Sequence, residues 1–152
     1  MRKLKAEEVS LLDLCKQCIN DKWMMPVSLL CSIDKTWHVI HFVLTGGERD
    51  TVLAKMIFSE NYVNGEDMGY GPAALVTPEE VNEINLALKG IAKEWFRERF
   101  FVRDMFANEI YPVMEGEDEN DFFEYVYHYF EEAKAFFEEA AKDGQCVLFF
   151  IG

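Results

Sequence analysis

The stretch SIDKTWHVIHFVLTGG, residues 32–47, carries the densest combination of core-forming and chemically capable side chains in the sequence. Neighbouring residues of an α-helix are about 100° apart around its axis. This spacing gives a predicted helix one apolar stripe, formed by Ile33, Trp37, Ile40 and Leu44. A second stripe, called the polar stripe below, lies beside it within an arc of about 60° and consists of Asp34, His38, His41 and Thr45. The stretch therefore predicts one buried helix with a candidate site on its flank.

Both ends of this helix carry recognisable signals. Ser32 or Asp34 is predicted to cap its first turn, because short polar side chains accept hydrogen bonds from free backbone N–H groups there. Gly46 and Gly47 follow its last turn, and glycine readily adopts the left-handed conformation that commonly ends a helix.

Other segments predict further helices. Apolar residues recur with helical spacing over residues 6–19, and a turn is predicted between residues 20 and 27. Residues 50–58 favour a short helix, although a buried strand also fits. The sequence TPEE at 77–80 offers a capping hydroxyl, a proline at the first helical position and an acid at the third, which predicts a helix over residues 78–89. Residues 92–106 fit one helix or two short ones equally.

The last third of the chain predicts a long helix followed by a strand. Pro112 must leave helix, and the acidic residues 115–121 predict a solvated loop. Phenylalanines line one face of the predicted helix over residues 122–140. The ending QCVLFFIG is apolar throughout, as expected of an interior strand, and residues 73–76 predict a short second strand. Several helices packed on the faces of a small sheet, with the C-terminal strand near its middle, satisfy this pattern.

Composition predicts one cytoplasmic domain spanning residues 1–152. Half of the residues are hydrophobic and 14% are aromatic, which supplies a sizeable core. The start lacks the pattern of an export signal, and the longest apolar run, residues 146–151, is far shorter than the roughly 18 residues of a membrane span. Four cysteines are too few for a disulfide scaffold and fit a reducing compartment.

Charge is distributed unevenly along the chain. The net charge is −13, and residues 104–143 hold 13 acids against two lysines, a balance of −11. Such a surface repels phosphate backbones, which excludes nucleic acid as a direct partner and favours a basic protein. We call residues 104–143 the acidic segment.

Three segments together resemble the YfbM-like family of domains of unknown function: DKTWHVIHFVLTG at 34–46, MGYGPAALVTPEEV at 68–81 and EIYP at 109–112. The resemblance implies a single cytoplasmic bacterial domain with an α/β fold, in which helices cover both faces of a small mixed sheet in three layers. It implies no established activity. The opening MRKLKAEE differs from the short apolar strand common in the family. The sequence therefore does not decide whether that edge strand is present. Ala74 and Met114 stand where members often have arginine and tryptophan.

The polar stripe admits two interpretations. Its histidines could form a general base oriented by Asp34, or two ligands of a metal ion. The sequence favours the alternative, in which they are half-buried neighbours whose nitrogens bond backbone or loop groups, because no nucleophile or third ligand is evident. His128 falls on the acidic face of the last helix, so no metal and no cofactor are assigned.

Other motifs favour structural roles. Cys15 and Cys18 have the spacing of a redox pair but fall on the apolar face of a helix. The sequence GYGP at 69–72 favours a tight turn over a phosphate loop. Arginines at 97, 99 and 103 could form an anion pocket but are expected to pair with the chain's own acids.

Two functional hypotheses follow. The first is a non-enzymatic binding or interaction protein, monomeric or weakly dimeric, whose acidic segment masks a basic partner. The second is an enzyme or small-ligand binder that uses His38 and His41 at a cleft closed by the loop at 61–72. Residues expected around that cleft are Trp37, Gly69, Tyr70, Gly71 and Tyr111. The second hypothesis requires a hollow that both imidazoles line.

Overall fold

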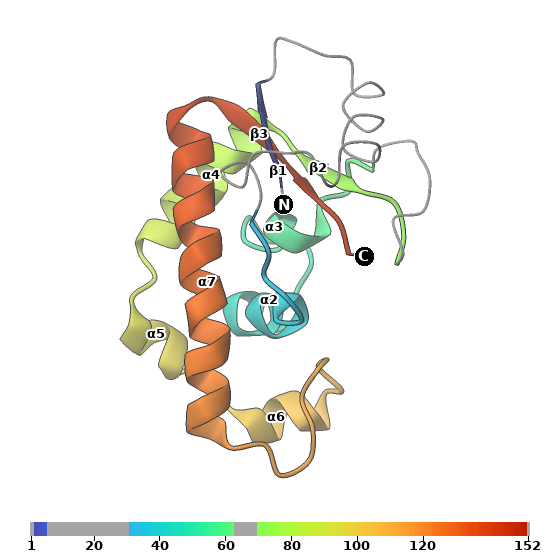
Figure 1. Ribbon diagram of the computed structural model, residues 1–152, viewed down its shortest axis with the longest axis vertical. Helices are drawn as coiled ribbons and strands as arrows, with labels where there is room; N and C mark the ends of the chain where they lie inside the picture. The colour runs from blue at the N-terminus through green and yellow to red at the C-terminus, as the bar shows by residue number, and fades with distance from the viewer. Residues whose placement is uncertain (1, 6–30, 63–69, 152) are drawn as a thin grey trace.

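A long C-terminal helix forms the spine of the molecule and returns the chain to a small sheet (Figure 1). The computed structural model describes residues 2–5, 31–62 and 70–151. The predicted helix at 6–19, the turn at 20–27, the cysteine pair Cys15 and Cys18, and Gly69 lie outside these ranges. In the described ranges, no helix has the length and apolarity needed to cross a membrane.

The sheet has three described strands in the order β1-β3-β2. They are β1 (Arg2–Lys5), β2 (Ala74–Val76) and β3 (Gln145–Phe149). The central position of the C-terminal strand is confirmed, and the edge strand that the opening sequence left open is present as β1. All five residues of β3 are buried, as its unbroken apolar sequence predicts.

The prediction of a mixed sheet is wrong for the described strands, because both pairings are antiparallel. Val76 at the end of β2 pairs with Val147 at the middle of β3, and Ala74 at the start of β2 pairs with Phe149 at the end of β3. The last helix thus delivers the chain to the end of the sheet where β2 finishes, so β3 runs back along it.

The described helices are α2 (Trp37–Thr45), α3 (Lys55–Phe58), α4 (Pro78–Lys89), α5 (Lys93–Arg97), α6 (Val102–Ala107) and α7 (Glu119–Lys142). Helices α4 and α7 pack against each other and against β3. The helix-rich α/β fold is therefore confirmed. The prediction that helices cover both faces of the sheet stays a prediction, because the predicted helix at 6–19 lies outside the described ranges.

The core follows the phenylalanine pattern of the last helix. Phe130 and Phe137 of α7 are fully buried, and Phe96 of α5 stacks on Phe130 with 4.6 Å between ring centres. On the opposite side of α7, α2 contributes Val39 and Ile40, which are also fully buried. Helix α2 therefore lies beside the spine, and its remaining faces are free to build a site.

Helix α2 begins later than predicted. Thr36 donates its N–H and its hydroxyl to the carbonyl of Ile33, which closes a turn before the helix. Ser32 accepts from the N–H of Asp34 within this turn, and Asp34 has φ of 44°. Neither side chain caps α2, so that prediction is wrong. The predicted end is confirmed, because left-handed Gly46 donates its N–H to Phe42.

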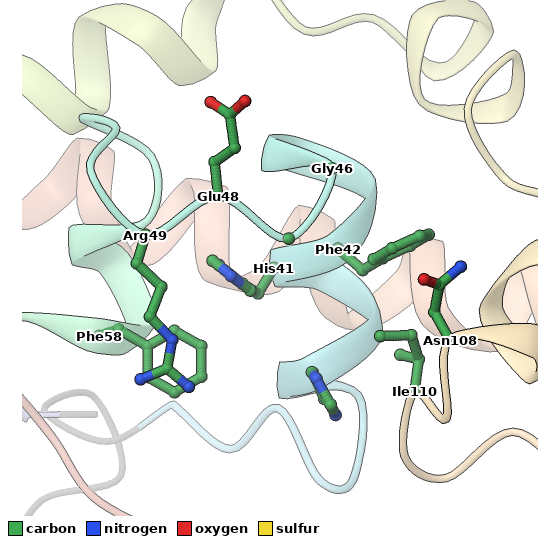
Figure 2. Close-up of a pocket in the computed structure, with 10 residues that line it drawn as sticks. His41, Phe42, Gly46, Glu48, Arg49, Phe58, Asn108 and Ile110 are labelled. Carbon is green, nitrogen blue, oxygen red and sulfur yellow. The ribbon is translucent and has the colours of Figure 1, made fainter.

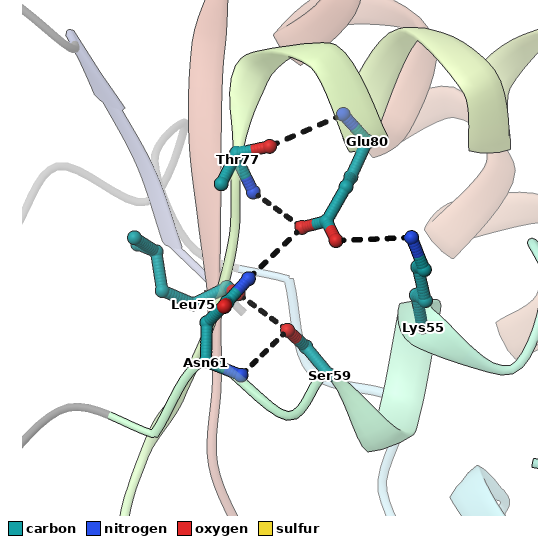
Figure 3. Close-up of polar contacts among 6 residues, drawn as sticks. All are labelled: Lys55, Ser59, Asn61, Leu75, Thr77 and Glu80. Carbon is teal, nitrogen blue, oxygen red and sulfur yellow. Dashed lines mark hydrogen bonds and ion pairs between the residues drawn. The ribbon is translucent and has the colours of Figure 1, made fainter.

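The strongest predicted helix, residues 78–89, is confirmed with the same bounds. Figure 3 shows its capping box, in which Thr77 and Glu80 satisfy each other's backbone N–H groups. Glu80 also bonds Lys55 of α3, at 3.1 Å, and the amide of Asn61, at 3.3 Å. One carboxylate therefore joins α3, α4 and the segment before β2.

The segments that join the longer elements form short helices. Residues 50–58 end in the short helix α3, as favoured, and residues 92–106 form two short helices, α5 and α6. Helix α7 begins at Glu119, inside the acidic run that was predicted to be loop as far as residue 121. The side chain of Asp118 caps it by accepting from the N–H groups of Asn120 and Asp121.

Candidate functional site

A hollow of about 460 Å³ opens beside α2, between the turn that follows the helix and the segment after α6 (Figure 2). This volume falls in the range of small-molecule sites. We call it the histidine hollow, and its lining consists of His38, His41, Phe42, Gly46, Gly47, Glu48, Arg49, Phe58, Asn108 and Ile110. The question left open by the sequence is thereby answered, because both imidazoles of α2 line a hollow.

His41 is the more deeply placed imidazole, with only 4% of its surface exposed. Its ring meets Phe58 edge to face, with 4.7 Å between ring centres. Its Nε2 lies 3.5 Å from the hydroxyl of Thr45, one helical turn later. Its Nδ1 is buried and has no hydrogen-bond partner among the described residues. A buried polar atom without a partner is uncommon in folded proteins and requires an explanation.

The hydroxyl of Thr45 determines which nitrogen of His41 carries the proton. This hydroxyl donates to the backbone carbonyl of His41, at 2.8 Å, and accepts from the N–H of Gly47, at 3.1 Å. Since its proton is already used, the contact with Nε2 requires the proton to be on the imidazole. The unpartnered Nδ1 is then a lone pair, which can accept a hydrogen bond.

Burial lowers the pKa of His41 to about 4. The nearby backbone of Gly47 acts in the opposite direction, whereas His38 and the guanidinium of Arg49 lower the pKa further by repelling positive charge. The imidazole is therefore neutral at physiological pH.

His38 is half-buried and lies nearer the rim. Its Nδ1 accepts a hydrogen bond from the backbone N–H of Tyr111, at 3.1 Å, which assigns the proton of the neutral ring to Nε2. The ring stacks on Trp37, with 5.0 Å between centres and 11° between planes. Burial, followed by repulsion from Arg49, lowers the pKa of His38 below its ordinary value. His38 thus presents an N–H donor without a positive charge.

The turn after α2 supplies the charged residues of the lining. Gly46 and Gly47 have φ of 68° and 92°, which side chains rarely adopt, and they reverse the chain beside the helix. In Figure 2, Arg49 extends to Phe58 while Glu48 points away from the imidazole of His41. The guanidinium carbon of Arg49 lies 4.3 Å from the centre of the Phe58 ring.

The polar stripe is divided by the structure. His38 and His41 line the hollow, and Thr45 supports His41 from one turn away. Asp34 precedes the helix, and its carboxylate accepts from the hydroxyl of Tyr125 on α7, at 2.5 Å. Asp34 therefore ties the turn before α2 to α7, and the helical stripe that was predicted to include it begins only at residue 37.

The predicted cleft residues are also divided. Trp37 and Tyr111 adjoin the hollow through His38, with their ring centres 6.4 Å apart. Tyr70 is 84% exposed, and neither it nor Gly71 lines the hollow. The loop at 61–72 was expected to close the site, but the lining comes from residues 46–49 and from Asn108 and Ile110. For its described residues, that expectation is wrong.

The prediction that the arginines pair with the chain's own acids is confirmed for Arg97 but not for Arg99. Arg97 pairs with Glu119, at 3.3 Å, and lies over Phe123. Arg99, two residues beyond the end of α5, stacks on Trp95 of that helix, 3.8 Å from the ring centre. Within the part of the chain that the structure describes, no group of three histidine, cysteine or acidic side chains could hold a metal ion.

Sequence reasoning missed most of the lining. The doubled glycine after the histidine helix could have indicated a chain reversal that brings Glu48 and Arg49 back to the helix. Asn108 and Ile110 lie about sixty residues further along the chain, and their approach depends on the path of α6, so no local pattern indicates it.

Comparison with known proteins places this fold in a family. The model of the family described as "Domain of unknown function (DUF1877)" matches residues 1–150. The crystal structure of YfbM from Escherichia coli, described as a protein of unknown function, superposes with a TM-score of 0.71 at 19% identity, over 99% of this chain and 97% of that one. No curated protein matches the chain. Because the family model spans nearly the whole sequence, the chain belongs to the DUF1877 family.

Proposed function

We propose that the protein is a binding protein whose histidine hollow takes a small polar ligand. The observation that carries this proposal is the buried Nδ1 of His41, which has no hydrogen-bond partner in the described part of the chain and lies at the wall of a hollow of about 460 Å³. Pockets that bind small molecules combine apolar walls with a few fixed polar groups. Phe42, Phe58 and Ile110 supply such walls, and the two imidazoles supply the polar groups.

Binding is favoured over general-base catalysis by the basicity of the imidazoles. A general base is most effective when its pKa lies near the working pH. The pKa of His41 is lowered to about 4, so the imidazole is a weak base at neutral pH. As a neutral hydrogen-bonding group, by contrast, it remains available over the whole physiological range.

The test uses the three histidines as internal probes. Imidazole ¹⁵N resonances are recorded during titration with a library of small polar compounds. A ligand in the hollow shifts the resonances of His38 and His41 and leaves those of exposed His128 on α7 unchanged. His41→Phe, which keeps a buried ring of similar size, should abolish the response, whereas His128→Phe should not. If no compound shifts His38 and His41 selectively, the proposal is wrong.

A second candidate function rests on the outer face of α7. Glu131, Glu132 and Glu138 are exposed there, and Glu132 has only the imidazole of His128 as a close partner among the described residues. Together with the −11 balance of the acidic segment, this face favours a basic protein partner.

The electrostatic partner makes a separate prediction. A pull-down at low salt should recover a basic protein that is lost at moderate salt, because exposed charges are screened. A variant with Glu131, Glu132 and Glu138 changed to glutamine should lose the partner. Exposed Glu79, Glu83 and Glu98, on α4 and beyond α5, provide a control of equal charge. Recovery of a partner whose binding does not depend on the salt concentration would contradict this candidate function.

A further inference from the structure

We infer that the ligand of the histidine hollow is a small organic monoacid, whose carboxylate is held by the guanidinium of Arg49 and the Nε2–H of His38 and whose apolar body lies against Phe58 and Ile110. The inference rests on the proposed binding function and names the chemical class of the ligand. Four observations support it.

The first observation is the availability of Arg49. Its guanidinium lies over Phe58, and no carboxylate of residues 31–62 or 70–151 comes within ion-pair distance. Glu48 is the sole acid of the lining and points away from His41 (Figure 2). Arg97, which lies over Phe123 of α7, is by contrast paired with Glu119. The hollow thus carries an exposed cation on a protein whose net charge is −13.

The second observation concerns hydrogen-bond polarity. Because the backbone N–H of Tyr111 occupies Nδ1 of His38, the neutral ring can only donate from Nε2. Nε2 has no acceptor among the described residues, so it is available to a ligand. A guanidinium and an uncharged N–H donor together suit an anionic oxygen group.

The third observation is the charge that the lining can neutralise. The hollow has one cation, and burial together with Arg49 keeps both imidazoles neutral. One guanidinium matches the single charge of a carboxylate and forms two parallel hydrogen bonds with it. A phosphate monoester carries up to two charges at neutral pH, and one of them would remain without a partner. The lining therefore favours a carboxylate.

The fourth observation is the composition of the remaining wall. The rings of Phe42 and Phe58 and the side chain of Ile110 leave apolar surface around the charged end. The buried lone pair of His41 adds one acceptor, which a hydroxyl of the ligand or a bridging water can satisfy. A flat or aliphatic acid of modest size complements this arrangement, whereas inorganic phosphate leaves the apolar wall uncovered.

Calorimetric titration at low salt and pH 7.5 tests the inference with benzoate, its neutral isostere benzamide, phenyl phosphate and inorganic phosphate. We expect benzoate to bind at least about tenfold more tightly than benzamide, since the charged contact is worth at least about one decade in Kd. Arg49→Gln should remove this preference without weakening benzamide. Arg99→Gln is the matched control, because Arg99 is also exposed and stacked on an aromatic ring but lies outside the hollow.

Each other outcome overturns the inference in a distinguishable way. Equal affinity for benzamide and benzoate, with selective shifts of His38 and His41, would keep the binding function and eliminate the acid. Tighter binding of either phosphate compound would eliminate the carboxylate. Equal losses in Arg49→Gln and Arg99→Gln would show that bulk charge, and not the hollow, attracts the anion. Arg49→Lys keeps the charge but not the paired donors. If this variant retains part of the preference for benzoate, the loss of the preference in Arg49→Gln does not reflect misfolding.

Discussion

Replacing His41 by phenylalanine should make the protein less sensitive to mild acid. The pKa of His41 is about 4 in the folded protein and about 6.5 in the unfolded chain. Above pH 6.5 neither state binds a proton at this position, so the group has no effect on stability. Between pH 6.5 and 4 the unfolded chain takes up a proton that the folded protein excludes, and stability is lost over this window. Below pH 4 both states are protonated and the loss is complete.

The size of the effect follows from the distance between the two pKa values. Each pH unit of that distance corresponds to about 1.4 kcal/mol, so the complete loss on acidification is of order 3 kcal/mol. His38 contributes in the same direction, because burial lowers its pKa as well. In His41→Phe the contribution of residue 41 disappears and that of His38 remains.

Urea denaturation from pH 7.5 to 4.5 measures this contribution. Carboxylates also titrate near the lower limit, but their effect is common to both proteins and cancels in the difference between wild type and variant. The free energy of unfolding of the wild type should fall by about 2 to 3 kcal/mol more than that of His41→Phe. His128→Phe, at an exposed position, should follow the wild type. A difference that stays constant within about 0.5 kcal/mol over this range would refute the neutral, buried state of His41.

Three further changes test the fold. Thr77→Ala removes the capping box of α4 and should lower the free energy of unfolding by about 1 kcal/mol in urea, with Glu83→Ala, on an exposed position of the same helix, close to neutral. Phe130→Ala empties a fully buried site and should cost about 3 to 5 kcal/mol, whereas Phe101→Ala, at 51% exposure, should cost far less in the same assay. Tyr125→Phe removes the bond to Asp34 and should lower the thermal midpoint slightly, by the equivalent of about 1 kcal/mol; an unchanged midpoint would show that this exposed contact contributes nothing.

Local sequence signals predicted the elements whose stability is local. The capping box at Thr77 and Glu80 gave the bounds of α4 correctly, because both partners lie within one turn. The phenylalanine spacing of α7 identified its buried face, since amphipathic periodicity reports directly on burial. The apolar ending likewise identified β3 as the central strand.

The start of α2 could not be predicted in the same way. Periodicity extends the helix back through Asp34, but Thr36 closes a turn on Ile33 and the helix begins one residue later. The carboxylate of Asp34 then bonds Tyr125, which is 91 residues away in sequence. A contact between distant residues overrides the local pattern here.

The candidate site was predicted only in part, because most of its lining comes from residues outside the histidine helix. Both histidines were found because they belong to one helix. Arg49 reaches them through the doubled-glycine turn, and Asn108 and Ile110 reach them through tertiary packing, which the sequence does not specify locally.

The strand order β1-β3-β2 has a consequence for synthesis on the ribosome. Among the described strands, the two outer ones are not neighbours, and each pairs with β3, which comprises residues 145–149. While the chain is being made, residues 2–5 and 74–76 therefore have no strand with which to complete this sheet. The sheet can close only after β3 has left the exit tunnel. Helix α7, which precedes β3 directly, emerges just before it and delivers the missing strand to partners that were made first.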